Sequence, residues 1–306
     1  QSQANRGVKS RSVTFEQALQ ASGLIPGAIV ADGKWRRCKT TDKPKHRNGA
    51  YVLHADGRGY WRNWATDHAV NSWGADAAQV RVPTAAELAA RELRKQQERE
   101  YRLRAIRGAR EQWAQARPPR ALHPYLERKG LSAVGTNTLR VHGDALIVPV
   151  FWRDRLMSIQ SITPDGQKRF WTGAPVKGGA LVLDRPRAAV TAVCEGLATG
   201  LAIFQSLRMA RVIVAFDAGN LIHAVDQLRP TGSVVICADN DHGTEAKRGT
   251  NPGREKAANA AELIGAGVAW PEGIEGTDWA DYLAEAGEGG ARKMGRLIQA
   301  KARYVT

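Results

Sequence analysis

From residue 188 onward, uninterrupted apolar runs alternate with helical patterns, and no other feature constrains the fold as strongly. The first run ends at Cys194 and is followed by a helical pattern from Leu197 to Leu207. Strands that are apolar along their whole length and alternate with helices are typical of a parallel sheet covered on both faces. The sequence therefore predicts an α/β unit with a four-stranded parallel sheet and flanking helices. Its strands are expected within residues 188–194, 211–216, 233–238 and 267–271.

Carboxylate residues follow all four apolar runs. In an open parallel sheet, ligands bind outside the carboxyl ends of the strands, which lie at one edge. A single acid after a strand is more often a helix N-cap than a ligand. Acids after four strands instead favour a Mg²⁺ or Mn²⁺ site, because clustered carboxylates repel each other unless a cation is present. These acids are Glu195, Asp217, Asp239, Asp241, Glu272, Asp278 and Asp281.

Three motifs in order resemble the Toprim domain shared by DnaG-type primases and type IA and II topoisomerases. They are Val193-Cys194-Glu195-Gly196, Ile236-Cys237-Ala238-Asp239-Asn240-Asp241 and Gly276-Thr277-Asp278-Trp279-Ala280-Asp281-Tyr282-Leu283. The third motif also looks like a segment of phage- and plasmid-encoded (mobile-element) primases. The resemblance covers residues 188–286. It implies that Glu195, Asp239 and Asp241 are catalytic and hold Mg²⁺ or Mn²⁺, and that Asp278 and Asp281 complete the metal cluster.

Residues 121–187 read as a second, mostly β subdomain, with strands such as Ala145–Phe151 and Leu156–Ile162 separated by turn residues. This segment resembles, more loosely, the catalytic subdomain that precedes Toprim in primases. Its basic residues suit nucleotide or template phosphates, although an exposed hairpin charge is an equally good explanation for any one of them. A basic stretch at 242–253 is either a phosphate-binding loop before a helix or a surface loop. The candidate nucleotide-binding residues are Lys168, Arg169, Lys177, Arg254 and Lys256.

Residues 1–83 predict a small antiparallel β module, with a hairpin formed by residues 50–54 and 59–64 around Asp56-Gly57. Primases usually carry a zinc ribbon here, but Cys38, His46, His54 and His68 do not have ribbon spacing, so no zinc is expected. Aromatic residues interleaved with basic ones suit stacking on unpaired bases. Trp61 is expected in the core, and Trp64 is left open. The candidate DNA-binding residues are Trp35, Arg36, Arg37, Lys45, Arg47, Tyr60, Arg62 and Trp64.

The charge is distributed unevenly along the chain. Residues 1–187 hold 33 Lys or Arg and 16 Asp or Glu, whereas residues 188–306 hold 12 and 14. A basic first part favours a polyanionic partner, and a solvated basic surface is the alternative. Residues 84–120 predict a basic helical linker that begins with a capping box at Thr84–Glu87, and residues 287–306 predict a C-terminal helix or tail. The polar N-terminus, three cysteines and absence of a long apolar run predict a cytoplasmic protein without membrane contact.

The resemblance implies a DNA primase that makes short primers on single-stranded DNA from nucleoside triphosphates. The sequence has no P-loop, so any replicative helicase would be another chain. Two alternatives share parts of this prediction. A Toprim-type nuclease would use the same metal site to cut DNA without nucleotides. A non-catalytic single-stranded DNA-binding factor would bind DNA without using the carboxylates.

Overall fold

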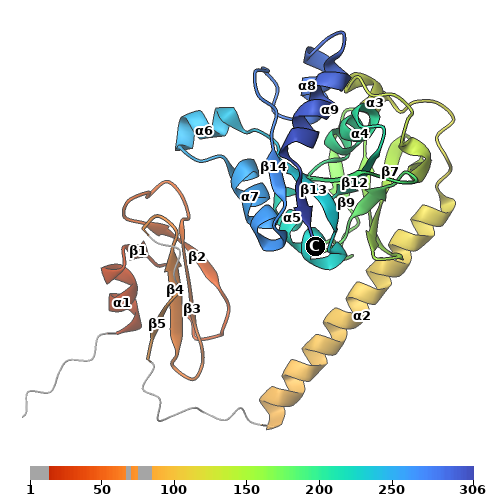
Figure 1. The fold of residues 1–306 in the computed structure, drawn as a ribbon. Helices are drawn as coiled ribbons and strands as arrows, with labels where there is room; N and C mark the ends of the chain where they lie inside the picture. Colours follow the sequence, from red (N-terminus) through yellow and green to blue (C-terminus); the bar gives the residue numbers. More distant parts are fainter. Residues whose placement is uncertain (1–13, 67–69, 75–84) are drawn as a thin grey trace, which may run out of the picture. The chain divides into compact units, whose positions relative to one another are not determined.

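The aromatic and glycine-rich segment near the N-terminus folds into an antiparallel sheet (Figure 1). The computed structural model describes residues 14–66, 70–74 and 85–306, and divides the chain into two units, residues 1–91 and 92–306. In the first unit, five strands pair in sequence order. The predicted hairpin is present, and Gly57 in its turn has a φ of 81°. The strands are β1 (Leu24–Ile25), β2 (Arg36–Thr40), β3 (Gly49–Leu53), β4 (Gly59–Asn63) and β5 (Asn71–Trp73).

Helix α1 (Phe15–Ala21) covers this sheet and completes the core of the first unit. A capping box between Thr14 and Gln17 starts the helix. Phe15 packs edge-on against Trp61, with ring centroids 6.2 Å apart. Trp61 is therefore a core residue, as expected, and Cys38 is buried in the same cluster.

The long helix α2 (Ala85–Gln115) crosses the boundary between the two units (Figure 1). Its last turns pack through Ala109 against Ile147 and Ile159 of the second unit. The predicted capping residue Thr84 lies outside the described residues. Among the residues that the structure describes, no helix is both long enough and apolar enough to cross a bilayer.

An antiparallel sheet of four strands, in the order β6-β7-β8-β9, opens the second unit. It follows the short helices α3 (Pro124–Arg128) and η1 (Thr136–Thr138). Val150 and Ile162 of this sheet belong to the same hydrophobic cluster as Ala192 and Cys194 further along the chain. The subdomain expected at 121–187 therefore shares its core with the α/β part. The strands are β6 (Arg140–His142), β7 (Ala145–Trp152), β8 (Arg155–Ile162) and β9 (Lys168–Phe170).

The predicted parallel sheet is present as the centre of a larger mixed sheet. Four parallel strands lie in the order β12-β11-β13-β14: β11 (Val190–Cys194), β12 (Ala210–Val214), β13 (Gly232–Cys237) and β14 (Gly267–Ala269). Two antiparallel strands that we did not predict for this sheet extend it. β10 (Leu181–Leu183), expected in the preceding β subdomain, pairs with β12, and β15 (Arg303–Val305) pairs with β13.

Helices cover both faces of the mixed sheet because successive side chains of its strands point to opposite sides. Ala192 and Cys194 of β11 pack on the face of α4, α8 and α9, whereas Val193 packs on the face of α5 and α7. The helices are α4 (Leu197–Ser206), η2 (Ala218–Asn220), α5 (Leu221–Leu228), α6 (His242–Arg248), α7 (Pro252–Ile264), α8 (Trp279–Glu285) and α9 (Gly290–Lys301). The stretch expected as a loop at 242–253 thus contains a helix, α6.

Candidate active site

The carboxyl ends of β11 and β13 bring Glu195 and Asp239 to the same edge of the sheet. The strands are in parallel register at Cys194 and Cys237, so the residues that follow them lie side by side. The first turn of α7 closes on both: a Cβ added to Gly253 would lie 2.6 Å from the backbone oxygen of Asp239 and 3.4 Å from Oε1 of Glu195. The structure therefore joins two acids that are far apart in the sequence.

Burial and mutual repulsion perturb these carboxyl groups. Burial raises the pKa of Glu195 to about 7, and the charge of Asp241 adds to this shift. Burial raises the pKa of Asp239 to about 8, with the charges of Glu195 and Asp278 adding to it. Thr199 Oγ1 donates a hydrogen bond of 3.4 Å to Oδ1 of Asp239, which partly offsets the rise. The three predicted catalytic acids thus interact electrostatically at one edge.

The predicted metal cluster is not assembled as a set of ligands. Among the described residues, no three His, Cys, Asp or Glu side chains are grouped so that they could hold an ion. The chemistry of the site nevertheless fits a divalent cation. Oε1 of Glu195 is buried without a hydrogen-bond partner, and the repulsion between Glu195 and Asp239 is the kind that a cation relieves. Carboxylate oxygens are also the ligands that Mg²⁺ prefers.

Asp278 and Asp281, predicted to complete that cluster, form a capping box at the start of α8. Oδ1 of Asp278 accepts from the backbone N–H of Ala280 and of Asp281. Lys129 at the end of α3 donates to Oδ1 of Asp281 at 2.8 Å and to Oδ2 of Asp278 at 3.1 Å. These interactions give both carboxylates hydrogen-bond partners at the start of α8, and their role as metal ligands stays a prediction. Sequence reasoning missed Lys129, since nothing in its local pattern marks a partner 149 residues away.

A polar network supports the loop that carries Asp239 and Asp241. Asn251 caps α7 and donates to Oδ1 of Asn240 at 3.0 Å and to Oε2 of Glu245 at 3.1 Å. Arg254 pairs with Glu245 at 3.2 Å and lies 4.4 Å from the centroid of the Trp270 ring. Arg254, predicted to bind phosphate, therefore already has an anionic partner in the protein.

Lys168 lies next to Gly196 of the Glu-Gly motif, which follows β11. A Cβ added to Gly196 would be 4.0 Å from Nζ of Lys168, and this Nζ is 5.8 Å from the centroid of the Tyr125 ring. Phe170 of the same strand packs edge-on against Phe216, two residues after the end of β12, with ring centroids 5.8 Å apart. Strand β9 is thus held against the edge where the carboxylates lie. The other predicted phosphate-binding cations, Arg169, Lys177 and Lys256, are exposed.

In the first unit, the predicted DNA-binding residues divide into free and engaged side chains. Arg37 stacks over Trp64 at 4.2 Å from the ring centroid and donates to the backbone oxygen of Arg47. Arg36 forms an ion pair with Asp32 at 2.7 Å. Arg62 lies 5.7 Å from the Trp64 ring centroid, and Tyr60 packs edge-on against His54. Trp35, Lys45 and Arg47 are exposed, Trp35 at 54%.

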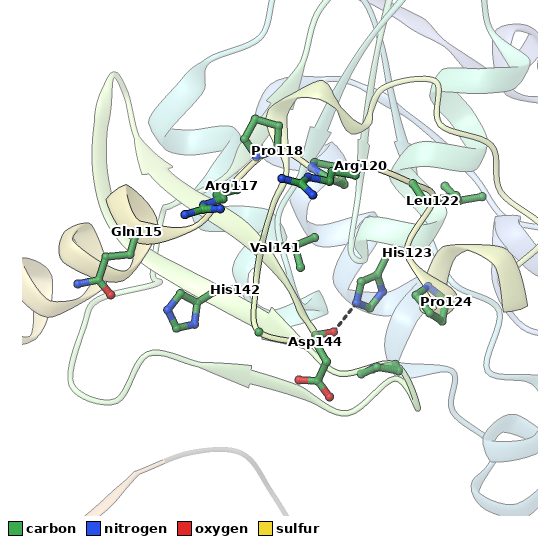
Figure 2. Close-up of a pocket in the computed structure, with 14 residues that line it drawn as sticks. Gln115, Arg117, Pro118, Arg120, Leu122, His123, Pro124, Val141, His142 and Asp144 are labelled. Carbon is green, nitrogen blue, oxygen red and sulfur yellow. Dashed lines mark hydrogen bonds between the residues drawn. The ribbon is translucent and has the colours of Figure 1, made fainter.

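A cavity of about 530 Å³ lies elsewhere in the second unit, between the end of α2, the β6–β7 hairpin and the start of α3 (Figure 2). His123 helps to shape it, because its Nδ1 accepts from the backbone N–H of Tyr125 and its Nε2 donates to the backbone oxygen of Asp144 (Figure 2). None of its lining residues is a predicted site residue. The perturbed carboxylates lie at the sheet edge, so we place the candidate site there.

Residues 190–289 match the family described as the Toprim domain. This agrees with the motif resemblance and assigns the sheet edge described above to that family. The matched range contains all the predicted catalytic acids.

Two proteins from Escherichia coli, both named "DNA primase TraC", are similar to most of the chain. One is 33% identical over 282 residues, covering 84% of this chain and 26% of that protein. The other is 30% identical over 285 residues, covering 84% of this chain and 19% of that protein. The chain thus spans about a quarter or less of these relatives' length. A solved structure described as the "DnaG primase catalytic domain bound to ssDNA" covers 67% of this chain and 81% of its own, with 13% identity and a TM-score of 0.42.

Proposed function

We propose that this chain, whose residues 190–289 form a Toprim domain, acts as a DNA primase of the mobile-element kind. The observation that carries the proposal is the similarity to proteins named DNA primase over 84% of the chain, combined with the acids at the ends of β11 and β13. The substrates would be a single-stranded DNA template and nucleoside triphosphates. A helicase, if one takes part, would be a separate partner.

In this proposal, Glu195, Asp239 and Asp241 hold Mg²⁺ or Mn²⁺. Ions held by these residues would supply charge that favours an ionised 3′-oxygen and a pyrophosphate leaving group. Without a cation, burial and the charge of Asp241 raise the pKa of Glu195, and a bound cation would favour its ionised form. Thr199 would orient Asp239 through its hydrogen bond. Asp278 and Asp281 would fix α8 beside the site and are not included in the ligand set.

The basic residues divide between nucleotide and template. Lys168, at the Glu-Gly motif, is the cation best placed to meet a triphosphate, with Arg169 and Lys177 further along the same segment. On α7, Lys256 is exposed, whereas Arg254 would contribute only where its ion pair with Glu245 leaves charge available. The first unit, with Trp35, Lys45, Arg47 and the stacked Arg37–Trp64 pair, would hold the template. The polar helix α2 would link the template-holding unit to the catalytic one.

A primer-synthesis assay tests the proposal directly. The protein is incubated with single-stranded DNA, labelled nucleoside triphosphates and Mg²⁺ or Mn²⁺. We expect short products from the wild type and a loss of about 100-fold or more in the Asp239→Asn variant. Glu272→Gln, an exposed acid after another strand of the same sheet, is the matched control and should retain activity. Cutting of the template without added nucleotides would instead identify a nuclease, and binding without either reaction would identify a binding factor.

A further inference from the structure

Asn220 is a buried polar residue to which neither the sequence motifs nor the proposed mechanism gives a role. It ends the short helix η2, just after β12, and its side chain is almost fully enclosed, with 4% of the residue exposed. The N–H of its own backbone is held by Oδ1 of Asp217 at 2.9 Å. A buried amide side chain must find hydrogen-bond partners, since an unsatisfied one costs free energy.

Those partners all lie in the loop before β10 and at the end of β12. Oδ1 of Asn220 accepts from the backbone N–H of Gly178 at 2.7 Å. Nδ2 of Asn220 donates to the backbone oxygen of Gly179 at 2.9 Å and of Ala215 at 2.8 Å. This arrangement fixes the orientation of the amide, because the reverse one would place Oδ1 against two carbonyl oxygens. One side chain thus ties the loop 176–179 to the end of β12.

The tied loop carries Lys177, whose side chain is exposed while Gly178 and Gly179 behind it are buried. The end of β12 is itself joined to the strand that delivers Glu195, since the N–H of Ala215 donates to the backbone oxygen of Cys194 at 2.8 Å. A short path of hydrogen bonds therefore connects the loop of Lys177 to the residue before Glu195. Gly178 has a φ of 76°, so the loop has a conformation that few other residues adopt without strain.

We propose that Asn220 is a positioning residue that holds Lys177 in place to bind the phosphates of an incoming nucleoside triphosphate beside the carboxylates. The inference rests on the proposed function, because it takes nucleotides as the ligand. Fixing the backbone of the loop lowers the entropy that Lys177 loses when it binds phosphate. Asn220 contacts no substrate itself, and its effect passes through Lys177.

The test is a double-mutant cycle read by nucleotide binding. Dissociation constants for fluorescently labelled ATP in the presence of Mg²⁺ are measured for the wild type, Lys177→Ala, Asn220→Ala and the double variant. We expect each single variant to bind about tenfold more weakly, and Asn220→Ala to add less than about twofold in the Lys177→Ala background. Asn220→Asp keeps the acceptor for Gly178 but loses the bonds that Nδ2 donates, including a long one of 3.5 Å to the backbone oxygen of Val176, and should resemble Asn220→Ala. Lys293→Ala, an exposed lysine on α9, is the control.

Equal and additive losses in the cycle would overturn the proposal, because they would show that Asn220 acts independently of Lys177. An unchanged affinity in either single variant would overturn it as well. Amide hydrogen exchange at Gly178 should become faster in both Asn220 variants. Unchanged exchange would contradict the role of Asn220 in holding the loop 176–179, even if a variant were less stable. These readouts do not need primer synthesis, so a protein that binds ATP without making primers would contradict only the proposed function.

Discussion

Gly253 is the residue through which the first turn of α7 packs against both main acids. Its Cα faces the backbone of Asp239 so closely that any side chain would meet that oxygen at 2.6 Å, and backbone atoms cannot move aside as the end of a flexible side chain can. We expect Gly253→Ala to push the first turn of α7 away from the Asp239 loop. The free energy of unfolding should fall by about 1–3 kcal/mol, measured by urea denaturation, and metal-dependent activity should fall with it.

Gly243 provides a matched comparison, since it lies in α6 and a Cβ there would meet no atom within 4 Å. Gly243→Ala should leave stability unchanged or raise it by about 0.5–1 kcal/mol, because alanine favours a helix over glycine. If Gly253→Ala were as stable and as active as Gly243→Ala, the close approach of α7 to Asp239 would be wrong.

At the residue scale, the sequence predicts which acids meet at the sheet edge, but it does not predict the buried and paired residues around them. Glu195 and Asp239 follow apolar runs, and the ends of parallel strands meet at one edge, so their meeting can be inferred from pattern alone. Asn220 and Lys129 carry no such mark. Their partners lie 42 and 149 residues away, and only the fold brings them together. The capping role of Asp278 follows from a local pattern that also fits a metal ligand, so the sequence leaves both readings open.

Between elements, the ion pairs of Lys129 join α3 to the start of α8 and make the stability of this contact dependent on pH. Burial opposes ionisation of Asp281, but Lys129 and two backbone N–H groups outweigh it and hold its pKa below the usual value. A carboxyl group with a lowered pKa in the folded state stabilises the protein above its unfolded pKa of about 3.9. That contribution is lost as the pH falls through the lower, folded value.

We therefore expect Lys129→Met to lower the free energy of unfolding at pH 7 by about 1 kcal/mol, as the pair is partly exposed. The difference from the wild type should shrink as the pH falls below about 4, because Asp281 then becomes protonated in the unfolded state while it is still ionised in the folded one. Arg128→Met, which removes an exposed neighbouring cation, should change neither the free energy of unfolding at pH 7 nor its dependence on pH. Urea denaturation across this pH range measures both, and a difference that stays constant with pH would contradict the ion pairs.

At the element scale, the parallel strands and their helices follow from the sequence, whereas the short additions do not. β10 and β15 have three residues each, too few for a strand pattern to show which sheet they join. β10 lies after Gly178-Gly179, within residues 121–187, so its place in the sequence alone groups it with the preceding antiparallel strands. α6 has no buried residue, so it lacks the apolar periodicity that predicts a helix.

For the whole molecule, the net charge of +15 is concentrated in the first 187 residues and should make DNA binding depend steeply on salt. Lys45 and Arg47 are exposed in the first unit, whereas Arg36 is paired with Asp32. We expect the double variant Lys45→Ala/Arg47→Ala to reduce the slope of log affinity against log salt by about 1.4, which is about 0.7 for each lost phosphate contact. Fluorescence anisotropy with single-stranded DNA measures this slope.

Arg36→Ala is the control for that measurement, because its charge is already compensated, and it should change the slope less than the double variant does. Identical slopes for all three proteins would place the template away from the first unit. The salt dependence of DNA affinity, measured for charge-removing variants in each of the two units, would then show which unit binds the template.

We propose that Glu195 and Asp239, which lie at the same edge of the sheet, bind a divalent cation together with Asp241. Titration of Mn²⁺ followed by electron paramagnetic resonance tests it without relying on catalysis. The wild type and Glu272→Gln should bind Mn²⁺ with the same affinity, and Asp239→Asn and Glu195→Gln should each bind about tenfold or more weakly. Equal Mn²⁺ affinity in all four proteins, or no binding by the wild type, would contradict the claim.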